Sequence, residues 1–244
     1  MKDLLKIVPS EILLLQETKI EEEALLLPSK TKWNLNVGKV VSVRGTSGGL
    51  ATLWSADKFQ LNNRYATQHW SVTDLFHISS KIFVSLFNLY VHVNYIEKKV
   101  CWKLLTDFLE VNSLENIIIV GGLNISLTPN EKKGGQRGKD FMHDTVEELI
   151  QVWDLIDLKP KLGRFTWSNH RVGATSISAR LDLFLVHNSL LDGKSIISSK
   201  ILPKLMSNHP PISLLFEKEE ELGPIPFRFS PLWIERDGFM DIVS

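Results

Sequence analysis

The 244-residue sequence contains one cysteine, has no excess of either charge and lacks a long uninterrupted apolar run. Cys101 has no partner for an intramolecular disulfide, which indicates a reducing compartment, and beside Trp102 we expect an inert core thiol. The 28 basic and 28 acidic residues cancel, so any attraction to nucleic acid must come from local patches. Aliphatic runs such as residues 117–120 are far shorter than the roughly 20 residues of a membrane-spanning helix.

Glycine-rich nucleotide-binding motifs are also missing. Neither Gly-x-Gly-x-x-Gly nor a Walker sequence occurs, so a nucleotide-binding fold has no support. No long apolar stretch precedes the acidic residues 21–23, which argues against a secretory signal. We therefore expect an intracellular, soluble protein, nuclear or cytoplasmic, with no membrane partner and no small-molecule cofactor. Its oligomeric state does not follow from these features.

A hydrophobic content of 43% is enough for one sizeable core. Apolar and β-branched runs predict strands at residues 11–16, 50–54, 80–90, 117–120, 181–186 and 212–216. Helical periodicity is found at residues 2–8, 95–109 and 140–152. Because strands and helices interleave without strict alternation, we expect an α/β sandwich of two sheets flanked by helices. One domain over residues 1–216 is expected, followed by a charged linker and tail over residues 217–244.

Short polar signatures stand at the ends of these apolar runs. They are Gln16-Glu17-Thr18-Lys19, Asn88-Leu89-Tyr90, Gly121-Gly122-Leu123-Asn124, Arg180-Leu181-Asp182 and Ser207-Asn208-His209. Strands that deliver carboxylate, phenol, amide and imidazole groups to one rim supply what metal-assisted phosphodiester cleavage needs. Glu17 is the best candidate for a magnesium ligand, because magnesium prefers carboxylate oxygens. The alternative is a glutamate that faces solvent at a strand end, and Tyr90 could likewise bury its ring in a core.

The order and spacing of these signatures resemble the endonuclease/exonuclease/phosphatase family, and most of all the endonuclease domain of plant non-LTR (LINE-type) retrotransposons. The resemblance implies a DNase I-like fold, a four-layered α/β sandwich with two packed mixed β-sheets flanked by helices. It also implies Mg²⁺-dependent hydrolysis of DNA. In such enzymes Glu17 would hold the metal, Tyr90 would reach the scissile phosphate and Asn124 would hold a phosphate oxygen. Asp182 would pair with His209.

Substrate contacts are expected from three places. The candidates are Lys132, Lys133 and Arg137 in a basic loop, Trp167 and Asn169 in a segment that resembles the family's substrate rim, and Arg180 in the Arg-Leu-Asp motif. Cations in such a loop can contact phosphates, and an aromatic ring can stack on or wedge against a base. A merely solvated loop and a core tryptophan are the alternatives.

Two positions depart from the family pattern. Gly122 stands where the family has an aspartate that positions or deprotonates the attacking water, and a shift of one residue would make this a deletion. Asn208 replaces the aspartate beside His209 and loses a negative charge that would help to hold the metal. A positioned general base contributes roughly 10²- to 10⁴-fold in rate. We therefore expect severely reduced or lost turnover, weak or lost Mg²⁺ binding and weak or lost DNA binding.

The two ends of the chain add further expectations. Relatives open with an additional strand, so this chain resembles an N-terminally truncated domain with a loosened core. The tail over residues 217–244 resembles the segment that leads to a reverse transcriptase. Alternatives to the impaired endonuclease are a non-catalytic relic or nucleic-acid-binding module, and a phosphatase of the same fold. The loop at residues 165–167 and the tail argue against the phosphatase.

Overall fold

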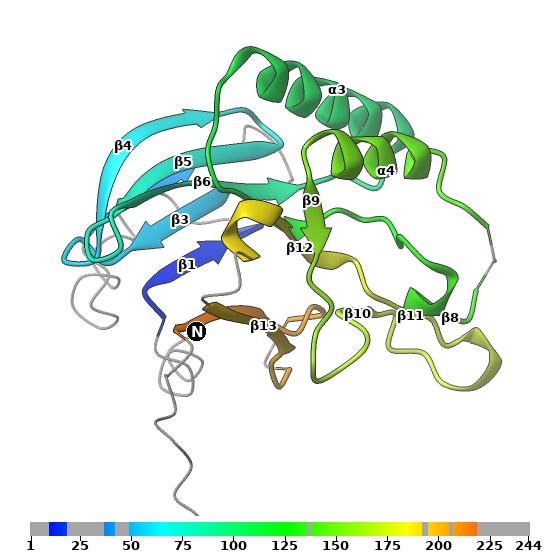
Figure 1. Ribbon diagram of the computed structural model, residues 1–244. Coiled ribbons are helices and arrows are strands. Elements are labelled where there is room, and N and C mark those ends of the chain that lie inside the picture. Colours follow the sequence, from blue (N-terminus) through cyan, green and yellow to red (C-terminus); the bar gives the residue numbers. More distant parts are fainter. Residues whose placement is uncertain are drawn as a thin grey trace, which may run out of the picture.

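The computed structural model describes residues 10–18, 37–41, 49–135, 138–191, 195–204 and 207–218, which form four sheets and two α-helices (Figure 1). The largest sheet has six strands in the order β4-β5-β6-β7-β12-β9. Their bounds are β4 Phe59–Ala66, β5 Trp70–His77, β6 Ile82–Tyr90, β7 Ile117–Gly122, β12 Asp182–His187 and β9 Leu155–Asp157. Only β6 and β7 run parallel, so the sheet is mixed.

Two smaller sheets pack against one face of the large sheet. One has the order β1-β3-β2, with β1 Ile12–Leu15, β3 Leu50–Trp54 and β2 Val37–Val41. The other pairs β13 Ser195–Ile201 with β14 Ile212–Lys218. A single hydrophobic cluster joins them to the large sheet, since Leu14 and Leu214 pack with Phe184 and Val186. A further small sheet consists of β10 Trp167–Ser168, β11 Ser178–Ala179 and β8 Lys132–Lys133.

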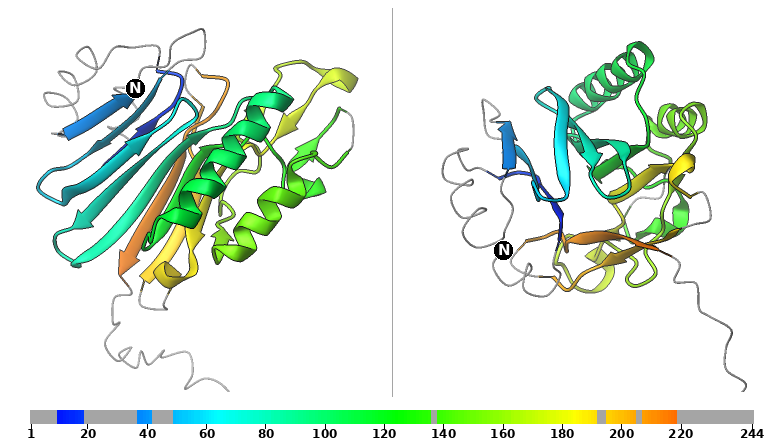
Figure 2. Two further views of the ribbon diagram at one scale, coloured as in Figure 1. Left: turned by 90° about the horizontal axis from the view of Figure 1, so that it is seen from above. Right: turned by 60° about the vertical axis from the view of Figure 1, so that its left-hand side comes forward.

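Both described helices cover the opposite face of the large sheet. Figures 1 and 2 show α3 Tyr95–Val111 and α4 His143–Val152 side by side on that face. The apolar residues of α3 recur at helical spacing, so that Trp102, Leu105 and Leu109 are buried on one stripe against the sheet. The Asn94 side chain accepts hydrogen bonds from the first turn and fixes where α3 begins, directly after the end of β6.

The expected α/β sandwich of packed sheets is confirmed. β3 has the expected bounds, and the central strand β7 extends two residues further than predicted, to Gly122. The described helices lie on one face only, and the predicted helix at residues 2–8 is outside the described residues. β14 runs to Lys218, two residues past the expected end of the domain, and residues 219–244 are outside the described part.

Two expectations from composition can be compared with the structure. Cys101 is fully buried in the cluster beneath the helices, and burial raises the pKa of its thiol to about 12, which confirms an inert core residue. Among the described residues, none of the helices has both the length and the hydropathy that a membrane span requires.

Candidate active site

Sheet register brings three predicted site positions into one row. Tyr90 ends β6, Gly122 ends β7, and the parallel pairing of these strands makes the two residues register partners. Asp182 begins the antiparallel neighbour β12 and is the register partner of Gly122 on its other side. Glu17 follows the end of β1 in the smaller sheet and reaches this row through Tyr90.

A hydrogen bond connects the first pair of candidate residues. The Tyr90 hydroxyl donates to Oε1 of Glu17 at 2.7 Å. Burial raises the pKa of Tyr90, and the hydrogen bond to Glu17 and the charges of Glu17 and Asp182 raise it further, so the phenol stays protonated. Glu17 has φ +50°, a left-handed backbone conformation that is uncommon for a residue with a side chain. A strained residue at this point suggests that its carboxylate is held for a function.

Asp182 and His209 form the second pair. Nδ1 of His209 lies 2.7 Å from Oδ2 of Asp182, as the resemblance implied. Burial alone would lower the pKa of His209, but the hydrogen bond and charge of Asp182, helped by Glu17, raise it above the ordinary value. The backbone N–H of Asp182 donates to Oγ1 of Thr166 at 2.9 Å, which holds the start of β12. The site can therefore present an imidazolium next to two carboxylates.

Two residues inside the motifs tie the sheets together, and the sequence analysis assigned them no role. Nε2 of Gln16 donates to Oδ1 of Asn88 at 3.1 Å and to the carbonyl of Leu89 at 2.8 Å, while its Oε1 accepts from the N–H of Gly122 at 3.2 Å. The buried Asn88 donates onward to the carbonyls of Leu15 and Ala51. The sequence did contain a signal for this role. Gln16 and Asn88 are amides within or next to apolar runs, and buried polar groups need hydrogen-bond partners.

The two neighbouring glycines have different steric surroundings. Gly121 has φ +134°, and a Cβ there would lie 1.9 Å from Nε2 of Gln16 and 2.2 Å from the carbonyl oxygen of Leu89. A Cβ at Gly122 would meet nothing closer than Oδ1 of Asp182, at 3.4 Å. Gly121 is thus the obligatory glycine, and Gly122 is the position from which a side chain could enter the site. This supports an alignment in which Gly122, with no residue deleted, replaces the aspartate.

Asn124 lies beyond the end of β7 and is partly tied to the backbone. Its φ is +50°, and its side-chain Nδ2 donates to the backbone carbonyl of Val91. The backbone carbonyl of Asn124 accepts a hydrogen bond from the buried ammonium of Lys98 at 2.9 Å. An amide nitrogen carries two hydrogens, so one of them is engaged with Val91 and the second could serve a phosphate oxygen. Asn208, on the loop before His209, is exposed.

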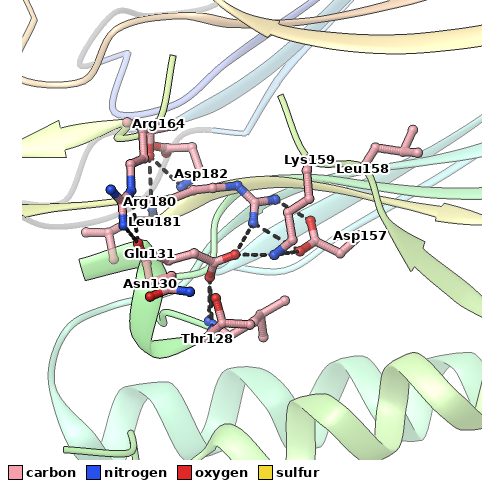
Figure 3. Close-up of polar contacts among 12 residues, drawn as sticks. Thr128, Asn130, Glu131, Asp157, Leu158, Lys159, Arg164, Arg180, Leu181 and Asp182 are labelled. Carbon is pink, nitrogen blue, oxygen red and sulfur yellow. Dashed lines mark hydrogen bonds and ion pairs between the residues drawn. The ribbon is translucent and has the colours of Figure 1, made fainter. Parts of the chain in front are cut away.

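Arg180 is placed differently from the other predicted substrate contacts. Its side chain is 3% exposed, and its guanidinium pairs with Glu131 at 2.5 Å and with both carboxylate oxygens of Asp157 (Figure 3). Lys159 completes the cluster with ion pairs to Asp157, at 2.7 Å, and to Glu131. Burial opposes the charge of Arg180, yet these carboxylates raise its pKa. With its donors directed to internal partners, Arg180 positions the strand that carries Asp182 and does not itself face a substrate.

Four of the remaining predicted contacts lie in described segments. Lys132 and Lys133 are exposed on β8, which pairs with β11, and Arg137 lies outside the described residues. Trp167 is half-buried on β10, so its burial does not decide between a core tryptophan and a ring that stacks on a base. The Asn169 side chain closes its own loop, donating to Thr175 at 2.9 Å and accepting from Ile177 at 3.0 Å, so it shapes the rim.

The carboxylates of the candidate site determine whether it can hold a divalent cation. Magnesium is usually bound by one or two protein carboxylates together with substrate phosphates and water. Glu17 provides one carboxylate, and the Oδ1 oxygen of Asp182 points toward the same row, at Gly122. These groups fit a weak magnesium site that a substrate phosphate would complete. A second group, His143, Asp144 and Glu147, is able to hold a cation but lies on α4, where Lys139 already pairs with Asp144.

No protein-family model and no curated protein matches the chain. Solved structures do match its fold. The endonuclease domain of TRAS1, a telomere-specific non-LTR retrotransposon, is similar with a TM-score of 0.63 at 14% identity, covering 89% of this chain and 90% of that one. An endonuclease/exonuclease/phosphatase from Bacteroides vulgatus has a TM-score of 0.64 at 13% identity, covering 89% and 88%.

A third similar structure is TDP2 from D. rerio in complex with a single-stranded DNA product, with a TM-score of 0.61, 14% identity, and 88% and 89% of the two chains covered. Identities at this level establish the fold and nothing finer. The chain therefore has the layered α/β fold of the endonuclease/exonuclease/phosphatase structures, as the motifs implied.

Proposed function

We propose that this chain is the endonuclease-like domain of a plant-type non-LTR (LINE-type) retrotransposon, built for Mg²⁺-dependent hydrolysis of DNA phosphodiesters and impaired in its chemical step. The main support is one arrangement, the row formed by Tyr90, Gly122 and Asp182, with Glu17 and His209 bonded to its two ends. The fold shared with the TRAS1 endonuclease domain supports the retrotransposon origin. The resemblance of the tail over residues 217–244 to the segment that leads to a reverse transcriptase is a sequence argument for the same origin.

The side chains of the row have distinct roles in this proposal. His209, kept cationic by Asp182, stabilises the negative charge that develops on the phosphoryl oxygens. The protonated Tyr90 donates a hydrogen bond to a phosphate oxygen when substrate displaces it from Glu17. A magnesium ion held by Glu17 would neutralise charge on the scissile phosphate and the leaving oxygen.

The impairment follows from the missing carboxylate. Gly122 leaves the centre of the row without a base that could accept a proton from the attacking water. A positioned base is worth roughly 10²- to 10⁴-fold in rate, and losing the charge at position 208 weakens the cation site as well. These losses are not additive when the groups act as a unit. We therefore expect the fold and the substrate rim to survive while turnover is severely reduced or absent.

The test is nicking of supercoiled plasmid with and without magnesium, by the unmodified chain and by the Gly122→Asp, Asn208→Asp double variant. We expect little or no nicking by the unmodified chain and magnesium-dependent nicking by the double variant. Adding Glu17→Ala to the double variant should abolish that gain. Robust nicking by the unmodified chain that depends on Glu17 would disprove the impairment, and an inactive double variant that still folds would disprove the endonuclease ancestry of the site.

The same departures favour a second function, a nucleic-acid-binding module without catalysis. The row keeps its cation, His209, and its hydrogen-bond donors while it lacks the base. If the double variant stays inactive and the unmodified chain binds DNA independently of magnesium, this second function replaces the first.

A further inference from the structure

A pair of basic side chains lies next to the proposed site and belongs to none of the motifs. The ammonium of Lys204 lies 2.6 Å from Nε2 of His170. Lys204 is on the loop between β13 and β14 that also carries His209, and the base of this loop is closed by a 2.8 Å hydrogen bond from the N–H of Leu202 to the carbonyl of Pro211. The charge of Lys204 is among the influences that lower the pKa of His209, against the larger raising effect of Asp182.

The backbone holds His170 in an uncommon conformation. Its φ is +56°, which makes it one of six described non-glycine residues with positive φ. Two others, Glu17 and Asn124, belong to the proposed site. Asn169 fixes the loop on which His170 lies, because its Oδ1 accepts from the N–H groups of Arg171 and Ile177. Because a left-handed conformation is costly for a residue with a side chain, this conformation of His170 points to a side chain placed for a ligand.

The chemistry of the pair selects the kind of ligand. An ammonium cannot accept a hydrogen bond, so any hydrogen bond between the two is donated by Lys204, whose Nζ lies 2.6 Å from Nε2 and 3.4 Å from Nδ1 of His170. The pair presents the positive charge of Lys204 to solvent. Lys204 carries three N–H donors and contacts the two ring nitrogens of His170, so at least one donor is available for an anion. A lysine that is already held in place loses less side-chain entropy when an anion binds. Both residues are exposed, so an anion can reach them from solvent.

On these grounds we propose that Lys204 and His170 form a second phosphate-binding subsite, occupied by the phosphodiester next to the scissile one. This rests on the proposed function and extends it to how the substrate is held: successive phosphates of one polynucleotide occupy His209 and the Lys204–His170 pair together. A single phosphate ester fills only the first position, so the subsite distinguishes a nuclease substrate from the small substrate of a phosphatase.

The experiment measures the binding of a short single-stranded oligonucleotide by fluorescence anisotropy over a range of salt, and of thymidine 5′-monophosphate by calorimetry. The variants are Lys204→Gln, which removes the charge, and Lys204→Arg, which retains it. Lys103→Gln is the matched control, because Lys103 is an exposed lysine on α3, in the helix layer away from the rim.

Lys204→Gln should weaken oligonucleotide binding about fivefold and reduce the slope of log affinity against log salt by about 0.7, the value for one phosphate contact on a single strand. Mononucleotide binding should not change. Lys204→Arg should keep the salt slope of the unmodified chain. An unchanged slope, or an equal loss in Lys103→Gln or for the mononucleotide, would overturn the subsite while leaving the proposed function in place. If the unmodified chain binds no oligonucleotide even at low salt, the subsite is refuted as well, and plasmid nicking by the Gly122→Asp, Asn208→Asp double variant then decides separately whether the proposed function stands.

Discussion

Gly122 and Asp182 are register partners on adjacent antiparallel strands, and a Cβ built on Gly122 would lie 3.4 Å from the Oδ1 oxygen of Asp182. The neighbouring Gly121 has no comparable space, because its Cβ would overlap Gln16 and the carbonyl of Leu89. Two adjacent glycines in one strand thus have different reasons for lacking a side chain. One is required by the backbone, and the other is sterically open to substitution.

This difference predicts opposite results for two alanine substitutions. Gly121→Ala should destabilise the protein by about 3 kcal/mol or more, because strain at positive φ adds to the overlap with Gln16. Gly122→Ala should change the free energy of unfolding by no more than about 1 kcal/mol, the range of an ordinary substitution. Urea denaturation of both variants measures the contrast, and similar losses at the two positions would refute the assignment of Gly122 as the open position.

A carboxylate at Gly122 should make stability depend on magnesium. Gly122→Asp places its side chain beside Asp182, and like charges at this separation repel each other. We expect a lower melting temperature than that of the unmodified chain in the presence of a chelator, and recovery when magnesium is added. Gly122→Asn, which has the same shape without the charge, should show neither effect. A melting temperature of Gly122→Asp that does not respond to magnesium would argue against a cation site at Glu17.

The hydrogen bond between Asp182 and His209 predicts a pH dependence of stability. Because the folded pKa of His209 is raised, the pair stabilises the fold fully below the unfolded pKa of about 6.5, and this contribution is lost as the pH rises through the folded pKa. His209 is 35% exposed, so solvent screening reduces the effect. Asp182→Asn should lower the His209 pKa measured by NMR titration and flatten the pH profile of unfolding. An unchanged titration would mean that the pair does not form in solution.

The sequence was most informative where apolar runs end in motifs. β3 and β7 were predicted from short, mostly apolar runs, and the structure buries every residue of both strands. α3 was predicted because its buried residues recur at helical spacing. The hairpin of β4 and β5 was missed, because β4 is mostly exposed and carries residues such as Asn62 and Asn63 that disfavour strands. Its strand structure depends on pairing with β5, which a local pattern does not reveal.

One of the two connections in the site was predictable from the sequence. Glu17, Tyr90, Asp182 and His209 were singled out from motifs, and the hydrogen bond between Asp182 and His209 agrees with the expected pair. The hydrogen bond from Tyr90 to Glu17 was not predicted, because Glu17 was expected on a metal and Tyr90 on the scissile phosphate. The catalytic roles of these residues stay predictions. The burial of Arg180 could not be predicted, because its partners Glu131 and Asp157 come from segments with no recognisable signal. Three-dimensional proximity of distant charges is a tertiary property, so the sequence suggested a substrate contact where the structure has an internal ion cluster.

The bridge made by Gln16 predicts a stability cost at a residue that contacts no substrate. Gln16→Ala leaves the N–H of Gly122 and the amide of Asn88 without their partner, which should cost about 1–3 kcal/mol. Gln60→Ala, on the exposed face of β4, should stay within about 0.5 kcal/mol. Chemical denaturation measures both variants, and equal effects would show that the bridge contributes nothing to joining the sheets.

The ion cluster around Arg180 predicts the largest loss of stability. Arg180→Met removes the buried guanidinium and leaves the nearly buried carboxylates of Glu131 and Asp157 to the half-exposed Lys159, and breaking a buried pair typically costs about 3–5 kcal/mol. Lys159→Met should cost much less, because Lys159 is 53% exposed and Arg180 still pairs with both carboxylates that it leaves. Combining Arg180→Met with Glu131→Gln should recover part of the loss, since one of the two negative charges is then removed. If Arg180→Met unfolds no more easily than Lys159→Met, the guanidinium is not the anchor of this strand, and a direct contact with substrate would again be the better explanation for Arg180.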